Sequence, residues 1–533
     1  MNQESDEVGE VDETEVLELT DESISRVKPL QILPYQKEHF KRVLEMLAVN
    51  CGILDNSAFG CGKMIISIAV AIAFKMGILV FAPKSVLPSW VKNCKLYGVT
   101  LYASMTYNAL RGTAKTGIKH GFLERTINNE QQEFVPTKKL EELAKQGLLI
   151  VYDECHYLKN EKSQQLEAAH AISREAVRLA KMGYNIRIDA LSATPADKKE
   201  NITSLFKILG IINSKKLYNY NRSSKTYTSI GLQEAVEKCN RYDPDTTFHI
   251  ICRPVNKTTS KIICHELYTR ILKKYITSSM PEPPIEYKKS VKNLFAIMPK
   301  EDVERIKQGA LLFSSATSYS QETGEINYST LNWGDLIRSR REIDSAKVNT
   351  MVRLAREKLI KHPHCKIILY FTYKRDMIES ARQLKEYNPL IMNGEVTKDE
   401  KRVELMEKFQ KDDDEYRVFI SNPKVGGLGI ELDDVNGGFP RYMYIAPSYM
   451  FMDQFQATGR IHRKNTKSKA TIRFVYSRDF VHEDSIFNSM ATKSIVARSM
   501  LMTDNSNVIF PGELSEVYEK IEGEKSDNES DDE

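Results

Sequence analysis

Short runs of apolar and β-branched residues alternate with helix-like segments in two separate stretches of this chain. In the first stretch, from about residue 30 to 215, these runs are Cys51–Leu54, Ile78–Ala82, Leu148–Tyr152 and Ile188–Ser192. In the second, from about 345 to 500, they are Lys366–Phe371, Val418–Ser421, Tyr442–Ile445 and Thr471–Tyr476. Strands that are separated by helices imply a parallel sheet covered on both faces. The sequence therefore predicts an α/β protein with two parallel-sheet lobes in tandem.

The segment between the two stretches, residues 216–340, breaks this alternation. It is rich in Tyr, Ser, Lys and Thr and contains Pro281-Glu282-Pro283-Pro284. We therefore expect an insertion, part helical and part irregular, between a first lobe over residues 25–215 and a second lobe over residues 341–500.

Charge is distributed unevenly along the chain. Residues 1–24 carry ten acidic residues and no Lys or Arg, and residues 513–533 carry ten acidic residues and two lysines. Since the whole chain has a formal charge of +4, the part between these ends carries +22. A basic body favours a polyanionic partner, and acidic ends of this kind are usually disordered. We expect disordered acidic tails at 1–24 and 501–533.

The composition argues against membrane and metal-rich classes. No apolar run approaches the roughly 18 residues that a membrane-spanning helix needs, and the acidic N-terminus does not resemble a signal peptide. The eight cysteines show no paired CxxC spacing, which favours reduced thiols over a zinc site. The alternative ligand sets are Cys252 with Cys264-His265, and His362 with His364 and Cys365. We expect a soluble intracellular protein without a membrane partner, and the sequence does not distinguish nucleus from cytoplasm.

A glycine-containing turn separates the first predicted strand from a helical pattern at Ile65–Ala71. The turn ends in Gly60, Cys61, Gly62 and Lys63. Glycines let backbone N–H groups turn toward phosphate oxygens, and a helix N-terminus adds positive potential. Lys63 would reach the β- and γ-phosphates of a nucleotide. An ordinary strand-to-helix turn is the alternative, so the motif gains weight only from other parts of the chain.

The residue after Lys63 departs from the usual phosphate loop. Ser or Thr normally follows the lysine and ligates Mg²⁺, whereas this chain has Met64, whose thioether is a poor ligand for a hard cation. Ser67 is one helical turn further along and does not simply take its place. Because Mg²⁺ usually keeps several waters, we expect weakened Mg-ATP binding, with loss of hydrolysis as the alternative.

An acidic pair, Asp153 and Glu154, ends the apolar run 148–152 and is followed by Cys155-His156. Two adjacent carboxylates at the end of an apolar strand are costly to place there without a metal or a proton role. Asp153 is the candidate Mg²⁺ ligand, and Glu154 is the candidate base for the attacking water. A surface Asp-Glu pair is the alternative, and the hydroxyl-containing run Leu191–Pro195 after the next strand argues against it.

A second candidate set lies far downstream, in the run Gln456–Arg463. On a helix, Arg460 and Arg463 would share one face, and Gln456 would lie on a similar face. Two guanidinium groups directed at a nucleotide would neutralise the charge that builds up on a transferred phosphate. A solvated basic helix is the alternative when this run is considered alone.

Taken in order, these motifs resemble those of superfamily 2 helicases and translocases over roughly residues 30–500. The closer resemblance is to the Swi/Snf-type double-stranded DNA-dependent ATPases. The similar segments are Leu33–Gln36, Ala82–Trp90, Asp153–Asn160, Gly426–Leu432 and 479–493, the last with His482, Glu483, Asp484 and Lys493. The resemblance implies two RecA-like lobes that bind ATP between them, and a helix that braces the second lobe. The nucleotide-binding positions that it implies are Gln36 at the adenine, Gly60, Cys61, Gly62, Lys63, Met64, Gly429 and Gln456.

Three positions depart from the Swi/Snf pattern. Ser192-Ala193-Thr194 is more general than the usual Gly-Thr-Pro, Lys464-Asn465 stands where Gly-Gln usually follows the final arginine, and Pro423 replaces a phosphate-contacting Thr. These changes leave the nucleic acid open: duplex DNA is favoured, and single strands or RNA are alternatives. The mixture suggests a divergent member, such as those of large DNA viruses or cytoplasmic genetic elements.

The resemblance also implies that nucleic acid crosses both lobes. The candidate contacts are Lys84, Ser85, Thr106, Thr372 and Lys374, with Ser104 and Tyr107 beside Thr106. Contacts to the backbone position a strand without reading its sequence, so binding should be sequence-tolerant and strongly salt-dependent. Trp90 is assigned to packing rather than to base stacking.

The combined prediction is an ATP-dependent nucleic-acid translocase or helicase that couples hydrolysis of Mg-ATP to movement on DNA, or to its remodelling or unwinding. The close alternative is an RNA-dependent ATPase that acts in transcription. A non-hydrolysing nucleic-acid-binding module is favoured by Met64 and opposed by Glu154, Arg460 and Arg463. Transcription or replication machinery is a further candidate partner, although residues 216–340 contain no specific docking motif.

Overall fold

The computed structural model describes residues 30–112, 117–128, 131–221, 226–252, 255–281, 285–316, 332–396, 399–426, 430–478 and 483–501. The chain divides into two compact units. The first consists of residues 1–283 and 496–504, and the second of residues 284–495 and 505–533. The expected insertion over 216–340 is divided between the two units. The expected acidic tails lie outside the described residues, apart from Leu501.

The first unit contains a six-stranded sheet in which every neighbouring pair is parallel. In spatial order its strands are β10 (Thr277–Ser278), β1 (Gly52–Asp55), β7 (Ile186–Leu191), β6 (Leu148–Asp153), β2 (Gly77–Phe81) and β3 (Leu101–Met105). The register pairs Leu191 with Asp55 on one side and with Asp153 on the other. The carboxyl ends of β1, β7 and β6 therefore meet at one edge of the sheet, which is where ligands bind in folds of this kind.

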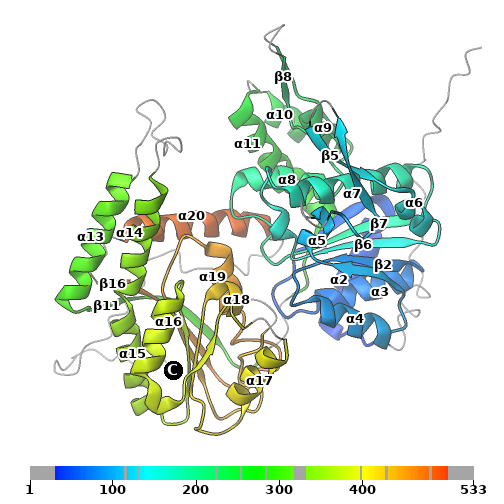
Figure 1. The fold of residues 1–533 in the computed structure, drawn as a ribbon. Helices are drawn as coiled ribbons and strands as arrows, with labels where there is room; N and C mark the ends of the chain where they lie inside the picture. The colour runs from blue at the N-terminus through cyan, green and yellow to red at the C-terminus, as the bar shows by residue number, and fades with distance from the viewer. Residues whose placement is uncertain are drawn as a thin grey trace, which may run out of the picture. The chain divides into compact units, whose positions relative to one another are not determined.

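Helices cover both faces of this sheet (Figure 1). The helices of this unit are α2 (Pro34–Val49), α3 (Lys63–Ala73), α4 (Leu87–Leu96), α5 (Tyr107–Arg111), α6 (Lys138–Ala144), α7 (Gln164–Lys181), α8 (Ile202–Ile208), α9 (Ile230–Asn240), α10 (Pro244–Ile251), α11 (Lys257–Leu267) and α12 (Lys273–Ile276). Short 3₁₀ or π turns are η1 (Cys155–Leu158), η2 (Lys199–Asn201) and η3 (Tyr268–Leu272). Two antiparallel hairpins complete the unit, β4 (Leu123–Asn128) with β5 (Gln131–Pro136), and β8 (Asn219–Asn221) with β9 (Thr226–Thr228).

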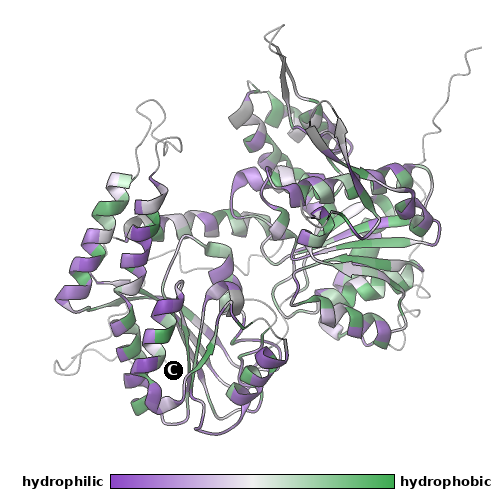
Figure 2. Ribbon diagram, viewed as in Figure 1, coloured by the Kyte–Doolittle hydropathy of each residue, from purple (hydrophilic) through white to green (hydrophobic). Residues whose placement is uncertain are grey.

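Alternate residues of the central strands enter two different apolar cores. On β6, Leu148, Ile150 and Tyr152 pack into the core shared with α7 and α8, whereas Leu149 and Val151 pack into the core shared with α2, α3 and α4. Successive side chains of a strand point to opposite faces, so a strand buried on both sides reads as a continuous apolar run. This explains why Leu148–Tyr152 is recognisable in the sequence, and Figure 2 shows green along the central strands.

The second unit contains another six-stranded parallel sheet. Its strands in spatial order are β11 (Lys289–Ala296), β16 (Ala470–Ser477), β15 (Arg441–Ile445), β12 (Lys366–Tyr370), β14 (Val418–Ser421) and β13 (Leu390–Met392). Its helices are α13 (Lys300–Ala316), α14 (Trp333–Ser345), α15 (Val348–Lys361), α16 (Lys374–Gln383), η4 (Lys385–Tyr387), α17 (Asp399–Gln410), α18 (Pro423–Gly426) and α19 (Phe451–Thr458). The helices α13 and α14 pack against each other, and Ser339 Oγ donates to the Gly309 carbonyl at 2.6 Å.

The last described helix, α20 (Asp484–Met500), contributes residues to both units. Just before it, Glu483 forms an ion pair with Lys347, and both side chains are fully buried. The Ser477 backbone N–H also donates to Glu483 Oε2 at 2.7 Å. On the helix, Lys493 Nζ donates to the Tyr449 carbonyl at 2.5 Å. These contacts fasten the start of α20 to the second unit.

Among the described residues, no helix combines the length and apolar character that crossing a membrane requires.

Candidate functional site

The loop between β1 and α3 has the backbone geometry of a phosphate-binding turn. Gly60 and Gly62 have φ angles of 76° and 95°, in the left-handed region that favours glycine. A Cβ on Gly62 would lie 2.5 Å from the Gln36 amide nitrogen, so any side chain there would displace Gln36. Lys63 begins α3, and its Nζ donates to the carbonyl oxygens of Ser57 at 2.9 Å and Ala58 at 3.1 Å. The ammonium group thus lies inside the turn, where it would meet phosphate oxygens.

Gln36 fixes this loop from the neighbouring helix α2. Its Oε1 accepts a hydrogen bond from the Leu33 backbone N–H at 3.0 Å, and its Nε2 donates to the Cys61 carbonyl at 2.7 Å. The Tyr35 hydroxyl donates to the same carbonyl at 3.1 Å. Gln36 is buried, so its amide orients the glycine turn in this structure. The contact from Gln36 to adenine stays a prediction.

Asp153 lies at the carboxyl end of β6, at the same sheet edge as the phosphate loop. Its Oδ2 accepts a hydrogen bond from the Trp90 indole N–H at 2.8 Å, and its carbonyl accepts one from the Tyr107 hydroxyl at 2.7 Å. Burial and then the charge of Glu154 raise the pKa of Asp153 to about 6, while Trp90 and Lys63 act in the opposite direction. A carboxylate oxygen beside a lysine in this position is a suitable donor for Mg²⁺.

Glu154 adopts a left-handed backbone conformation, with φ 53° and ψ 51°. A non-glycine residue pays a conformational cost there, and such strain is frequent at active sites. Its Oε2 lies 3.2 Å from His156 Nδ1, which is also 3.3 Å from Ser192 Oγ. Ser192 Oγ in turn accepts a hydrogen bond from the Thr194 backbone N–H at 3.2 Å. A continuous chain of polar contacts therefore joins the candidate base to the Ser192–Thr194 segment.

The side chain of Met64 contacts α4. Its sulfur accepts a hydrogen bond from Asn93 Nδ2 at 3.6 Å, and Asn93 lies three residues after Trp90 on the same helix. Ser67 does not replace the missing hydroxyl, because it is buried and donates to Asp189 Oδ2 at 2.7 Å. The residues near Lys63 therefore suit a cation that takes an oxygen from Asp153 and further oxygens from phosphate and water. In the described part of the chain, no cluster of three or more His, Cys, Asp or Glu residues suits a metal ion, and all eight cysteines are free thiols.

The candidate arginines of the second unit do not lie on a helix, which corrects the expectation of a shared helical face. The helix α19 ends at Thr458, with Gly459 as its C-cap, and Arg460 and Arg463 follow in an irregular segment. Glycine is a poor helix former and commonly ends helices. Arg463 Nη1 donates to Glu431 Oε1 at 2.6 Å, and its Nη2 donates to the Ile430 carbonyl at 2.9 Å.

The remaining predicted positions of the second unit are either buried or outside the described residues. The Arg460 carbonyl accepts a hydrogen bond from the Leu432 backbone N–H at 3.0 Å, and its side chain is largely buried. Gln456 is also buried, on α19. Gly429 lies outside the described residues. The segment that bears the arginines is thus tied to the residues that follow Gly429.

Comparison with known proteins decides the family. Residues 29–197 match the family described as "Type III restriction enzyme, res subunit", and residues 347–465 match "Helicase conserved C-terminal domain". The chain belongs to the superfamily 2 helicases and translocases. Its two parallel sheets are the tandem RecA-like lobes that the sequence predicts.

Three relatives of this superfamily 2 protein illustrate its range. It is 22% identical over 485 residues to "Putative ATP-dependent RNA helicase L364" of Acanthamoeba polyphaga mimivirus, covering 88% of this chain and 84% of that protein. It is 24% identical over 181 residues to the "ATP-dependent helicase FUN30" of Saccharomyces cerevisiae, covering 34% of this chain and 15% of the relative. It is 25% identical over 168 residues to the "ATP-dependent helicase fft1" of Schizosaccharomyces pombe, covering 31% of this chain and 17% of the relative.

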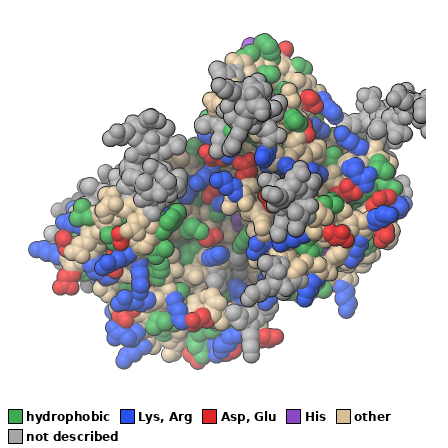
Figure 3. Space-filling view, turned by 45° about the horizontal axis from the view of Figure 1, so that its top comes forward, with side chains coloured by type: hydrophobic (Ala, Val, Ile, Leu, Met, Phe, Trp, Pro, Cys, Tyr) green, Lys and Arg blue, Asp and Glu red, His purple; other side chains and the backbone are tan. Residues whose placement is uncertain are grey.

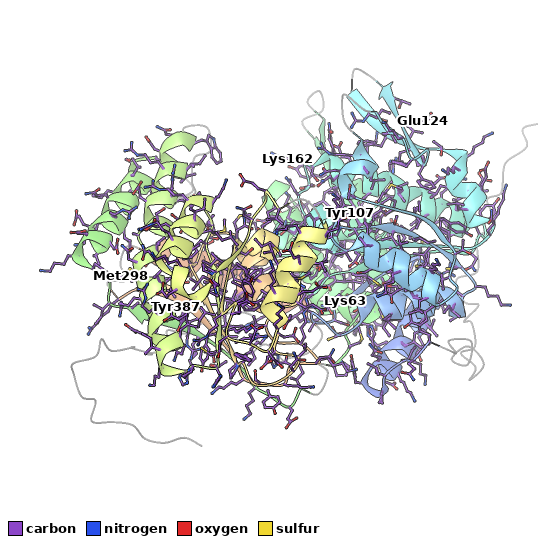
Figure 4. The ribbon with its side chains drawn as sticks, turned by 60° about the horizontal axis from the view of Figure 1, so that its bottom comes forward. Lys63, Tyr107, Glu124, Lys162, Met298 and Tyr387 are labelled. Carbon is purple, nitrogen blue, oxygen red and sulfur yellow. The ribbon has the colours of Figure 1, made fainter. Side chains whose placement is uncertain are left out.

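The predicted nucleic-acid contacts of this helicase differ in how accessible they are. Lys84 is exposed and Ser85 is partly buried. Thr106 caps α5 by accepting a hydrogen bond from the Ala109 backbone N–H at 3.1 Å, and Tyr107 is buried against Asp153 (Figure 4). Only the exposed members of the set are open to a phosphate backbone in this structure.

In the second unit, Lys374 is exposed, and its Nζ lies 2.5 Å from Glu395 Oε1. Thr372 is partly buried. Burial raises the pKa of the nearby Asp344 to about 7, against the opposing effects of Lys347 and then Thr372. Further Lys and Arg side chains are spread over the face seen in Figure 3, among acidic ones. The positively charged side chains are therefore distributed over this face and do not form one isolated patch in this view.

Sequence reasoning missed the role of Trp90. Its side chain is packed, as expected, but its indole N–H also holds the candidate metal carboxylate. A buried tryptophan usually finds a hydrogen-bond partner for its N–H, and that rule was the available signal. Asn93 and Asp189 were also missed, because nothing in their local sequence connects them with the phosphate loop.

Proposed function

We propose that this protein is a nucleic-acid-dependent ATP hydrolase that uses ATP hydrolysis to translocate on nucleic acid and thereby to remodel or unwind it. The observation that carries the proposal is the meeting of Lys63 and the Asp153-Glu154 pair at one sheet edge, in a chain that matches both helicase-type families. A phosphate loop and an acidic pair at adjoining strand ends can bind a nucleoside triphosphate and activate water against it.

The residues of the first unit have distinct roles in this proposal. Lys63 and the backbone of the turn Gly60–Gly62 bind the phosphates. Asp153 would hold Mg²⁺, and the ion would neutralise charge on the phosphates when bound. Glu154 orients the attacking water and accepts its proton, while His156 keeps the Glu154 carboxylate in place. Trp90 leaves one oxygen of Asp153 available by occupying the other.

The second unit supplies the remaining groups. Arg460 and Arg463 are proposed to neutralise the charge that develops on the transferred phosphate, which is the role of arginines in related phosphoryl transfers. In the present arrangement Arg463 is paired with Glu431, so it would exchange this partner for phosphate oxygens. Gln456 and Gly429 stay proposed nucleotide-binding positions.

Duplex DNA is the favoured nucleic acid. The Swi/Snf-like motifs of the sequence support it. RNA is the second candidate, because the viral relative that aligns over most of its length is named as an RNA helicase. Lys84, Ser85, Thr106, Thr372 and Lys374 are the proposed backbone contacts. Transcription or replication machinery is a proposed partner.

The test is phosphate release from Mg-ATP at low salt, with no nucleic acid, single-stranded DNA, duplex DNA or RNA. We expect stimulation by nucleic acid, strongest for duplex DNA, and a loss of roughly a hundredfold or more in Glu154→Gln, since a general base typically contributes that much. Glu124→Gln removes the same charge at an exposed position on β4 (Figure 4) and should leave the rate unchanged. Greatest stimulation by RNA would select the second candidate, and no hydrolysis in any mixture would contradict the enzymatic proposal.

A further inference from the structure

The base of the phosphate loop is hydrogen-bonded to both segments through which the chain passes between the two units. We call these segments the outgoing segment (278–281), which ends just before the boundary at 283, and the returning segment (496–501), which is the end of α20 and the residue after it. Both belong to the first unit where they make these contacts. On the side of the phosphate loop, these hydrogen bonds are made by Asn56 and Ser57.

The outgoing segment contacts the loop through three hydrogen bonds. The Asn56 backbone N–H donates to the Ser278 carbonyl at 3.0 Å. The Met280 backbone N–H donates to Ser57 Oγ at 2.7 Å, and the Ser279 hydroxyl donates to Asn56 Oδ1. Because Ser278 is in β10, which pairs with β1, the segment continues the sheet up to the loop.

The returning segment contacts the same asparagine. Asn56 Nδ2 donates to the Met500 carbonyl at 2.7 Å, and both side chains are buried. The end of α20 is held in place by Lys273, whose Nζ donates to the carbonyl oxygens of Ser499 at 3.1 Å and Leu501 at 2.9 Å. A cation at the carboxyl end of a helix satisfies carbonyls that have no partner within the helix.

Asparagine is suited to this position because its amide has a donor and an acceptor side by side. The donor is used by the returning segment and the acceptor by the outgoing segment. Burial makes both bonds matter, since a buried amide that loses its partner is left with an unsatisfied polar group. A displacement of either segment therefore breaks a buried hydrogen bond or moves Asn56, which lies four residues before Gly60.

We propose that Asn56 is a positioning residue that sets the phosphate loop according to the position of the outgoing and returning segments. Movement of either segment then changes the affinity of the loop for nucleotide phosphates, even though neither segment contains a proposed nucleotide-binding residue. The inference rests on the proposed function for its consequence, nucleotide binding. The mechanical link itself does not depend on that function and can be measured separately.

The experiment perturbs the link at a distance from the nucleotide. Lys273→Met keeps the aliphatic stem and removes the ammonium group that holds the end of α20. Its matched control is Lys274→Met, which removes the neighbouring, exposed ammonium group. Asn56→Leu removes both bonds of the amide at similar side-chain size. Each variant is compared with the wild type by hydrogen exchange of peptides covering 56–62 and by the affinity for a fluorescent nucleotide with Mg²⁺, after a thermal melt confirms folding.

We expect Lys273→Met to increase exchange in the loop and to weaken nucleotide binding roughly fivefold, as the loss of about one net hydrogen bond implies. Lys274→Met should match the wild type. Because Lys273 acts through Asn56, its substitution should have no additional effect in the Asn56→Leu background, which is the signature of coupled sites in a double-mutant cycle. Exchange and affinity that are unchanged in Lys273→Met, or effects that add fully in the double variant, would overturn the proposal. A wild type that binds no nucleotide would refute the proposed function, while the exchange data would still decide the link.

Discussion

Asp189 provides the sharpest test of the electrostatics beneath the phosphate loop. It lies on β7 and is 1% exposed, and its Oδ2 accepts a hydrogen bond from Ser67 at 2.7 Å. Its Oδ1 has no hydrogen-bond partner among the described residues. Burial and then the negative charge of Asp55 raise the pKa of Asp189 from 3.8 to about 7. The perturbation is Asp189→Asn, which keeps the shape and an acceptor but removes the ionisation.

The raised pKa of Asp189 determines whether stability rises or falls with pH. The folded protein holds the Asp189 proton more tightly than the unfolded chain, so this group costs stability as the pH rises from 3.8 to about 7. Well below pH 7 each pH unit changes the free energy of unfolding by about 1.4 kcal/mol, and this slope levels off near pH 7, so the wild type loses roughly 2 to 3 kcal/mol through Asp189 between pH 5 and pH 8.5. The variant lacks this loss. Its stability relative to the wild type should therefore rise by about that amount from pH 5 to pH 8.5.

The two tryptophans make the measurement specific to the first unit. Trp90 is buried there, whereas Trp333 is 58% exposed in the second unit. In a Trp333→Phe background, urea unfolding followed by tryptophan fluorescence reports the first unit alone. Asp245→Asn, an exposed substitution of the same kind on α10, is the control. A difference between Asp189→Asn and its parent that is the same at pH 5 and pH 8.5 would refute the reasoning.

Two further substitutions test the metal side of the site. Trp90→Phe removes the hydrogen bond to Asp153 and leaves a void where one ring of the buried indole was, so a thermal melt must first confirm folding. We expect turnover to fall roughly tenfold with a higher Mg²⁺ requirement, because hydrogen bonds to charged groups contribute about 1.5–3 kcal/mol. A Mg²⁺ titration of ATPase activity checks this, and an unchanged curve would contradict the positioning role. Met64→Thr supplies the missing hydroxyl oxygen and should lower the Mg²⁺ concentration for half-maximal activity. An identical titration to that of the wild type would mean that position 64 has no part in holding the ion.

The central strands could be predicted from the sequence, and the edge strands could not. The predicted run 148–152 differs from β6 by one residue, and Val418–Ser421 coincides with β14. Both strands are buried throughout, which makes the apolar run continuous. By contrast, β3 is only partly buried along its whole length, and β10 has two residues. The partly buried β3 does not differ enough from a loop to be recognised, whereas β10 is buried but too short to show a sequence pattern.

The candidate site could be proposed from the sequence where its residues are adjacent in the chain. Lys63, Asp153 and Glu154 each lie within a short local motif whose chemistry can be read without the fold. The pairing of Trp90 with Asp153 and of Asn56 with Met500 joins residues 63 and 444 positions apart. A local sequence pattern cannot identify such pairs, because they are brought together only by the folded sheet and the helix α20. The helical expectation for Arg460 failed for a related reason, since periodicity suggested a helix that Gly459 ends.

These distant contacts bear on how a superfamily 2 enzyme with Met64 could couple ATP hydrolysis to nucleic acid. The helix α4 begins two residues after Ser85, a proposed nucleic-acid contact, and its Trp90 holds the Asp153 carboxylate. A strand bound at Ser85 would therefore act on the metal carboxylate through one short helix. Such a path would make the position of the Asp153 carboxylate depend on α4. It would also make hydrolysis dependent on nucleic acid without any hydroxyl at position 64. On this argument, Met64 would lower the affinity for the ion while the geometry of Asp153, its proposed protein ligand, is preserved, so weakened binding is a better expectation than lost chemistry.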